Sequence, residues 1–467
     1  MSDCFTNAQP TLKSLWQQLK LPEATLQHTQ LTGSLPVLAS SFAVSTAAQS
    51  SIAAAASAAA LIANLRSGKH FTVGVSANAA AMECTSDFTI NGRTPPQWAE
   101  LSGLYRTSDG YLRVHANFDH HRDSLLQALQ LPAGTKKETA AAAIVQCSTT
   151  ELDTNITELG GACAALRTFE QWDNHPQAAA INGLPLIEIT RIGNAPTRKL
   201  DRFNETRGAL HGTRVLDLTR ILAGPVCGKT LAAYGADVML INSPHLPNID
   251  SIIETSRGKL SAHCDLKTPQ GVKALRTLLK DTHIIVQGYR PGSLANLGVG
   301  AEALCIEYPG LITVSLSAYG NSGPWREKRG FDSLVQTATG FNAAEAEAFR
   351  SATPKPMPVQ ILDYATGFLM AYGAQAALYK QLTEGGSYHV QLSLARTALW
   401  LKEMGQSMQF LNTEPPQSRD YLRPFESGYG TLAAIPHAAV FDGLPNHFRR
   451  PSVAPGTDAL HWPPAGS

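Results

Sequence analysis

The sequence has few of the residues that would indicate a metal site, a disulfide framework or a polyanionic partner. Only 7 of its 467 residues are cysteine, and no two of them are spaced as Cys-x-x-Cys. This usage favours reduced thiols in a cytoplasmic protein and predicts no metal site. The formal net charge is +1, so electrostatics give no reason to expect nucleic acid or an anionic membrane as a partner.

Apolar runs long enough to cross a membrane are also missing. The alanine-rich stretch 51–65 is short and contains Ser and Asn, so we predict a buried helix that packs closely against its neighbours. The first residues, Met1-Ser-Asp-Cys-Phe, have neither the basic nor the apolar run of a secretory signal.

Two segments of the chain, 61–82 and 378–399, align with each other without gaps. The matched pairs share one register: Leu65 with Leu382, Gly68 with Gly385, Val73 with Val390 and Ser76 with Ser393. When the alignment is extended backwards, Asp363 falls on Thr46. Both residue types can cap a helix, but only a carboxylate can act as an acyl-accepting nucleophile at neutral pH. The alignment predicts an internal duplication in which only the second copy carries chemistry.

Short apolar strands alternate with helices after residue 214. The expected strands are 215–218, 238–241, 284–286 and 311–316, and the expected helices are 226–234, 271–279 and 301–307. A long helix follows Asp363, and a further strand is expected at 388–392. This alternation predicts an α/β fold with a Rossmann-like, doubly wound parallel sheet, whose ligand binds beyond the carboxyl ends of the strands.

The region before residue 200 has a different pattern. Two alternating strands flank the turn Ser108-Asp-Gly, and helices follow from Asp119 to about residue 165, which is typical of a small α+β domain. The predicted domains are a partial repeat at 1–92, the small domain at 93–195, the Rossmann-like domain at 208–412 and a wrapping tail at 413–467.

Two other candidate sites are weaker. The turn 224–230 resembles a P-loop, but only three residues separate its glycines and Pro225 lacks an N–H, so an NTPase is disfavoured. The histidines near Asp119 favour a solvated helix start over a metal site; they are His115, His120 and His121.

Several motifs occur in a fixed order after residue 214. They are Arg214-Val-Leu-Asp-Leu-Thr-Arg-Ile-Leu-Ala-Gly-Pro, Ser256-Arg-Gly-Lys-Leu-Ser, Val286-Gln-Gly-Tyr-Arg-Pro-Gly, Gly330-Phe-Asp and Ile361-Leu-Asp-Tyr-Ala-Thr-Gly. In this order they resemble the family III CoA-transferases, which include formyl-CoA and carnitinyl-CoA transferases and the α-methylacyl-CoA racemases. The hairpin at 105–115 resembles the start of the family's small domain, so the order of domains is permuted.

The resemblance implies a CoA-transferase (EC 2.8.3) in which Asp363 is catalytic. The carboxylate would attack the thioester of an acyl-CoA and form a mixed anhydride, and CoA would then pass to an acceptor carboxylic acid. Coenzyme A is thus a substrate, with no permanently bound cofactor. The resemblance also implies a homodimer.

The resemblance places the CoA-binding residues at the ends of predicted strands. They are Arg220, Leu222, Ala223, Arg257, Lys259, Gly288, Tyr289 and Arg290. Arg257 and Lys259 would hold the phosphates, and Tyr289 would pack against the adenine with Arg290 close by. The family's asparagine before the aromatic residue is Gly288 here.

Two alternatives stay open. The racemase branch carries a histidine where this chain has Phe331, so proton exchange at the α-carbon is disfavoured but not excluded by sequence. A non-catalytic CoA-binding or scaffold protein is the other reading, because the order of the domains is rearranged.

Overall fold

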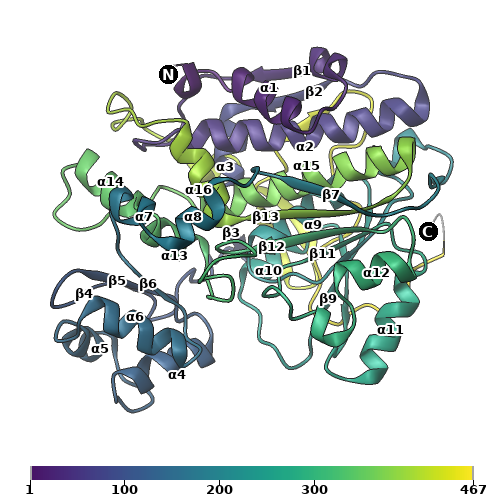
Figure 1. Ribbon diagram of the computed structural model, residues 1–467. Coiled ribbons are helices and arrows are strands. Elements are labelled where there is room, and N and C mark those ends of the chain that lie inside the picture. The colour runs from purple at the N-terminus through teal and green to yellow at the C-terminus, as the bar shows by residue number, and fades with distance from the viewer. Residues whose placement is uncertain (1–2, 465–467) are drawn as a thin grey trace.

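The central element of the fold is a seven-stranded sheet in the order β10-β9-β8-β11-β12-β13-β7. The computed structural model describes residues 3–464 (Figure 1). The strands are β7 (Glu188–Gly193), β8 (Arg214–Asp217), β9 (Asp237–Asn242), β10 (Lys259–His263), β11 (Ile284–Gln287), β12 (Ile312–Ser317) and β13 (Ser387–Ser393). All neighbours are parallel except β7, which runs antiparallel to β13. The fold is therefore α/β with a mostly parallel sheet, as the sequence predicts.

The two faces of this sheet bury alternate residues of each strand, because successive side chains of a strand point to opposite faces. Val238 packs into the core that contains α9 and α15, whereas Met239 packs into a separate core under α11. The helices of the two layers are α9 (Ala223–Ala233), α15 (Ile361–Glu384), α11 (Pro269–Leu279) and α12 (Ala301–Glu307). The strands are apolar on both faces for this reason, which is typical of a parallel sheet.

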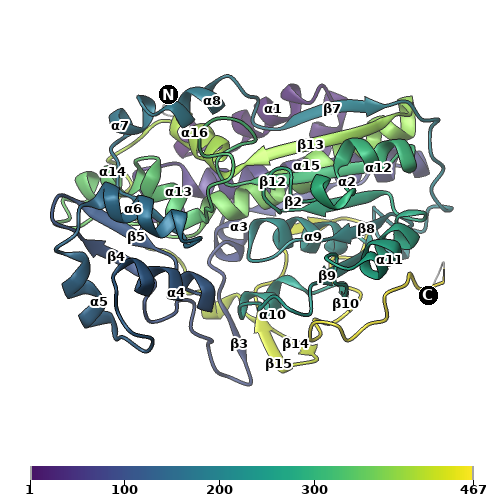
Figure 2. The ribbon, with the colours of Figure 1, turned by 60° about the horizontal axis from the view of Figure 1, so that its bottom comes forward.

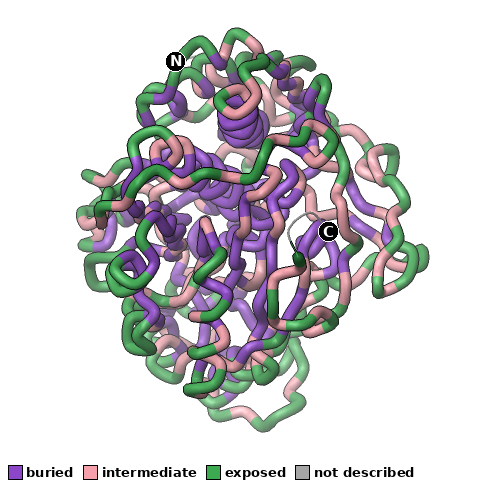
Figure 3. Tube along the Cα trace, turned by 90° about the vertical axis from the view of Figure 1, so that its right-hand side faces the viewer, coloured by how far each residue is buried: buried purple, intermediate pink, exposed green. Residues whose placement is uncertain are grey.

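Helix α2 (Val44–Ser67) lies between α1 (Gln9–Gln18) and α15. Among residues 3–464 it is the one helix long and apolar enough to cross a membrane, and the apolar window is buried inside the protein. Its many alanines allow close packing against α15. The predicted buried helix is confirmed, and Figure 3 shows such buried segments at the centre of the molecule, with exposed loops around them.

A three-stranded sheet, β1-β2-β16, repeats the arrangement of one edge of the large sheet. Its strands are β1 (Thr29–Thr32), β2 (Val73–Ser76) and β16 (Ala439–Phe441). β1 is parallel and β16 antiparallel to β2, just as β12 is parallel and β7 antiparallel to β13. Strand β16 comes from the C-terminal tail, so the tail completes a sheet that begins near the N-terminus.

Residues 103–165 form a compact module with a core of its own. It contains β4 (Gly103–Arg106), β5 (Tyr111–Val114), β6 (Cys163–Ala165), α4 (Asp119–Ala128), α5 (Lys137–Ile144) and α6 (Thr149–Glu158). The predicted hairpin and helices are present; β6 was not predicted. The module packs against α13 (Asp332–Ala338), beside which Figure 2 shows β5. His115 and Asn117, which follow the hairpin, line a cavity together with Asp363.

The tail also forms a hairpin, β14 (Arg423–Ser427) and β15 (Gly430–Ala434), which pairs with β3 (Phe88–Ile90). Leu432 and Ala434 of this hairpin pack with Phe88 in a small core. The hairpin therefore holds the segment that connects α3 (Ala77–Glu83) to the small module.

Candidate active site

Asp363 is the third residue of α15, and its side chain lines two cavities. The helix is not capped by this side chain, since Gln360 occupies the N-cap position. The backbone N–H of Asp363 donates to Oδ2 of Asp332 at 2.9 Å. Although the residue is only 7% exposed, both cavities reach it. The site therefore offers a buried carboxylate that a bound molecule can contact.

A glycine one turn further along α15 sets the position of Asp363. A Cβ atom at Gly367 would lie 2.5 Å from the carbonyl oxygen of Ala223 and 2.8 Å from Val226. Glycine therefore lets α15 pack directly against the first turn of α9. The positive end of the α9 dipole and its first N–H groups consequently lie near the carboxylate.

The loop between β8 and α9 is held in an unusual conformation. Asp217 accepts a hydrogen bond from the backbone N–H of Thr219 at 2.9 Å and forms an ion pair with Lys259 at 2.8 Å. Ile221 has a φ of 78°, which is rare for a β-branched residue and costs backbone energy. This loop brings Ile221 and Leu222 to the boundary of both cavities.

Asp363 and Asp332 form a buried carboxylate pair. Burial raises the pKa of Asp332 to about 7. Burial and, to a lesser degree, the nearby Asp332 raise the pKa of Asp363 well above its ordinary value. Two neighbouring carboxylates resist simultaneous ionisation. An ionised Asp363 is thus poorly solvated, which increases its reactivity as a nucleophile.

The first cavity, here called the basic cavity, has a volume of about 380 Å³ and is lined by many cationic side chains. Its lining includes Arg220, Arg290, Arg326, Lys328 and Arg329. Most of the predicted CoA-binding residues also meet there: Arg220, Leu222, Ala223, Gly288, Tyr289 and Arg290. The sequence contains the remaining cations as the cluster Arg326-Glu-Lys-Arg before Gly330, a signal that sequence reasoning missed.

Some of these cations have protein partners. Lys328 pairs with Asp153 of the small module at 2.7 Å. Arg220 places its guanidinium 5.1 Å from the centre of the Phe118 ring. These contacts fix the small module against the Rossmann-like half at the rim of the basic cavity.

The second cavity, here called the apolar cavity, has a volume of about 110 Å³. Its walls are mainly apolar and include Phe88, Pro95, Pro96, Trp98, Ile249 and Phe331. His115, which also lines it, stacks on Phe331 with ring centres 3.8 Å apart. Phe331, Ile221, Leu222 and Asp363 line both cavities, so the carboxylate lies at their junction.

Arg257 and Lys259 line neither cavity, contrary to their predicted role as phosphate ligands. Lys259 lies in β10 rather than in a loop, and its buried ammonium group pairs with Asp217. Arg257 is 2% exposed; it pairs with Glu254 and packs between Phe425 and Phe448. Both cations are thus held in ion pairs inside the fold, where loss of either partner would leave a buried charge without compensation.

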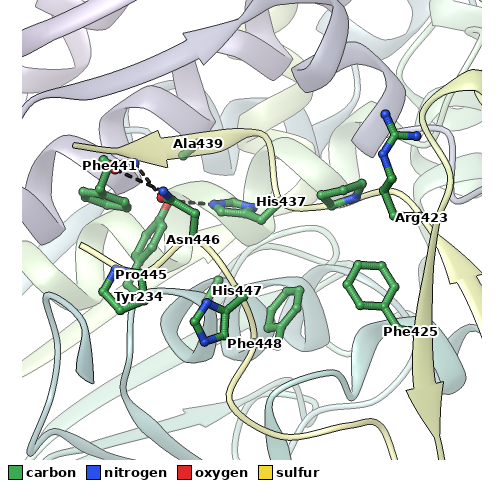
Figure 4. A pocket seen from close by; sticks show the side chains of 12 residues that line it. Tyr234, Arg423, Phe425, His437, Ala439, Phe441, Pro445, Asn446, His447 and Phe448 are labelled. Atoms are coloured by element: carbon green, nitrogen blue, oxygen red, sulfur yellow. Dashed lines mark hydrogen bonds between the residues drawn. The ribbon is translucent and has the colours of Figure 1, made fainter. Parts of the chain in front are cut away.

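The C-terminal tail forms another hollow around Tyr234, the residue that follows α9 (Figure 4). Asp363 is not among the residues that line it. His437 contacts the Tyr234 hydroxyl at 2.9 Å and Glu83 at 3.0 Å. Lys229, the lysine of the P-loop-like turn, is buried beside this network and pairs with Glu254 at 2.6 Å. It is therefore not presented to a phosphate, in agreement with the argument against an NTPase.

A sequence profile of the CoA-transferase family III matches residues 23–200 and 210–431. The chain belongs to this family. A succinate–glutarate CoA-transferase of Agrobacterium fabrum is 31% identical over 204 residues, which cover 40% of this chain and 50% of that protein. An acyl-CoA transferase of Gibberella moniliformis is 27% identical over 334 residues, covering 64% and 58% respectively.

A crystal structure of Rv3272 from Mycobacterium tuberculosis has 30% identity over 42% of this chain and 56% of that chain, with a TM-score of 0.38. The chain spans about half the length of the curated relatives that it matches. The match to the family profile over residues 23–200 and 210–431 confirms the resemblance that the motifs indicated.

Proposed function

We propose that this chain is a CoA-transferase that moves CoA from an acyl-CoA donor to a carboxylic acid through an acyl anhydride on Asp363. The observation that carries the proposal is the position of Asp363 at the junction of a basic cavity and an apolar cavity. The names of family relatives, among them the succinate–glutarate CoA-transferase, support transfer of CoA between carboxylic acids.

The proposed reaction uses only the carboxylate and the two substrates. An oxygen of ionised Asp363 attacks the thioester carbon, the C–S bond breaks and CoA leaves as a thiolate. The thiolate then attacks the aspartyl carbonyl of the anhydride, which releases the donor acid and leaves an aspartyl–CoA thioester. The acceptor carboxylate attacks this thioester, and the returning thiolate takes the new acyl group. No proton is consumed overall, and Asp363 is regenerated.

The surrounding residues have separate tasks in this proposal. Arg290 and Arg220 hold the phosphates of CoA by charge-assisted hydrogen bonds, and Tyr289 packs against the adenine. The first N–H groups of α9, at residues 222–224, stabilise the oxyanion that forms as Asp363 attacks. Burial of the site keeps water from the anhydride, which would otherwise hydrolyse.

The test is an exchange assay with an acyl-CoA and an isotopically labelled carboxylic acid. We expect label to enter the CoA thioester without net loss of CoA esters. The Asp363→Asn variant should lose at least about a thousandfold in rate, since the amide is no nucleophile. Asp442→Asn, an exposed residue that lines neither cavity, is the matched control. Undiminished exchange by Asp363→Asn would refute the proposal.

One observation bears on the racemase alternative. His115 places an imidazole against Phe331, where the racemase branch has its histidine. Burial, however, lowers the pKa of His115 to about 3, so this imidazole is a weak base for removing an α-proton. Exchange of the α-proton in deuterated water, without transfer of CoA, would favour the racemase; capture of CoA without either reaction would favour a scaffold protein.

We also propose that the protein is a cytoplasmic homodimer. The homodimer is checked by the mass of the protein in solution, which also bears on the second inference below.

A further inference from the structure

The two cavities that meet at Asp363 differ in charge. The basic cavity is lined by arginines and a lysine. The apolar cavity has no lysine or arginine in its lining, and its only carboxylates are Asp250 and Asp363. Coenzyme A is a polyanion, so the basic cavity suits CoA, and the apolar cavity is left for the acyl group on the other side of the thioester carbon.

The polar groups of the apolar cavity include no lysine or arginine that would neutralise a negative charge. Apart from the two carboxylates, they are neutral hydroxyl and amide side chains, such as Ser333 and Gln360, together with His115. His115 is 3% exposed, and its Nδ1 has no hydrogen-bond partner. Arg113 packs its guanidinium over the Trp98 ring, 4.8 Å from the ring centre, and does not line the cavity. A second carboxylate on the acyl group would therefore lose its hydration and meet Asp250 rather than a cation.

We propose that the acyl donor and the acceptor acid are monocarboxylic, with an uncharged and at least partly apolar acyl group that occupies the apolar cavity. This inference rests on the proposed CoA-transferase function and adds the class of substrate. Both acids use the same cavity, because each in turn is bound to the same carboxylate. Phe88, Trp98 and Phe331 provide flat apolar surfaces for such a group.

The test compares acyl-CoAs of equal length that differ only at the far end. Butyryl-CoA is matched with succinyl-CoA, and pentanoyl-CoA with glutaryl-CoA. We expect the uncharged member of each pair to have at least about a tenfold higher kcat/KM, since one desolvated charge is worth more than a tenfold change. A preference for succinyl-CoA or glutaryl-CoA would overturn the inference. If no acyl-CoA of the panel labels Asp363, the proposed function itself fails, which is a different result.

A charge-reversal variant sharpens this test. Asp250→Lys should raise kcat/KM for succinyl-CoA relative to butyryl-CoA, since it places a cation at the wall of the apolar cavity. Asp250 makes no capping hydrogen bond to the helix that follows it, so the fold should tolerate the change. Asp442→Lys is the matched control and should leave the ratio unchanged. An unchanged ratio in Asp250→Lys would mean that acyl groups do not reach this wall.

A second inference rests on the strand pairing and is independent of the substrate. The first unit, residues 29–83, contains β1, α2, β2 and α3; the second unit, residues 312–403, contains β12, α15, β13 and the following α16 (Leu394–Glu403). In the first unit Val73 pairs with Thr29 and Phe441, and in the second Val390 pairs with Val314 and Ile189. Each unit thus receives its antiparallel strand from the chain segment that follows the other unit.

We infer that this reciprocal exchange lets one chain form the whole active site, so that a second copy is not required. The apolar cavity already combines residues 86–117, which follow the first unit, with Asp363 of the second. A protease site inserted after Lys199, an exposed linker residue, provides the test. The two cleaved fragments should remain associated at the same mass in solution as the uncleaved protein, with one Asp363 labelled per chain and full activity. Separation of the fragments, or activity that requires a dimer, would contradict the inference.

Discussion

The helices α2 and α15 are alike in almost every respect except the residue near their N-terminus. Each contains 24 residues, each is buried, and each ends at a glycine with positive φ. The bounds agree with the register in which Thr46 falls on Asp363. Thr46 is 1% exposed and its hydroxyl donates to the carbonyl oxygen of Cys4, whereas Asp363 lines two cavities.

Under the proposed function, this difference indicates which surroundings a buried helix needs in order to carry a reactive group. Around Asp363 the first turn of α9, the strained loop at Ile221 and the small module leave space at the helix start. Around Thr46 the N-terminal segment occupies the corresponding place, and the carbonyl oxygen of Cys4 in that segment accepts the hydrogen bond of the Thr46 hydroxyl. The helix itself is thus a common structural element, and the elements packed around its first turn decide whether a reactive group can meet a substrate.

The largest effect on stability is expected at the glycines that follow the two helices, Gly385 after α15 and Gly68 after α2. Gly385 has φ 71° and ψ −169°, a region open essentially to glycine alone, and a Cβ there would lie 2.3 Å from the carbonyl oxygen of Ala195. Gly68 has φ 71° and nothing within 4 Å of its Cβ position. We expect Gly385→Ala to reduce the free energy of unfolding by about 3 kcal/mol and Gly68→Ala by about 1 kcal/mol. Equal costs in urea denaturation would show that the two ends are not packed differently.

The next prediction concerns the carboxylate pair, which only the second unit has. Because the pKa of Asp332 is raised to about 7, the folded protein binds a proton that the unfolded chain releases near pH 4. Stability from this proton is present below pH 4 and is lost as pH rises through about 7. Asp332→Asn removes this titrating group. Between pH 5 and 8 the unfolding free energy of the variant should therefore fall by about 1 to 3 kcal/mol less than that of the unmutated protein.

The same variant has a kinetic readout. Without the neighbouring charge, the pKa of Asp363 should decrease, so labelling by an acyl-CoA should begin at a lower pH. Asparagine keeps an acceptor for the Asp363 N–H but loses the acceptor for Gln336. Gln336→Met is therefore the control for the lost hydrogen bond. A labelling profile that does not move in Asp332→Asn would contradict the coupling of the two carboxylates.

The smallest effect is expected at Thr46. Thr46→Ala removes one buried hydrogen bond and should cost about 1 kcal/mol, without any change in kcat/KM. Thermal denaturation and the exchange assay measure both quantities on the same sample. A loss of activity beyond the loss of folded protein would mean that the first unit takes part in catalysis.

The sequence predicted much of the fold because the elements after residue 214 have simple patterns. The strands at β8, β9, β11 and β12 are short apolar runs, and two of the helices between them are followed closely by Gly235 and Pro309. Strand β10 was missed because Arg257 and Lys259 look like a solvated loop. Their burial depends on Asp217, Glu254 and the tail, whose contacts arise only in the folded chain.

Part of the candidate site could be assembled from the sequence for the same reason. Asp363 and the residues around Tyr289 lie in motifs, so they could be named from sequence. The walls of the apolar cavity come from Phe88, the prolines at 95 and 96, Trp98 and His115, and no motif joins them to Asp363. They meet it only because the small module packs against α13.

The central claim is tested most directly by identifying the residue that becomes acylated. The protein is incubated with an acyl-CoA, trapped with hydroxylamine and digested, and the peptides are mapped by mass spectrometry. The account predicts a hydroxamate at Asp363 and an unmodified peptide at 44–67, with no trapped adduct in Asp363→Asn. A hydroxamate on another residue, or exchange of CoA by Asp363→Asn at an undiminished rate, would contradict it.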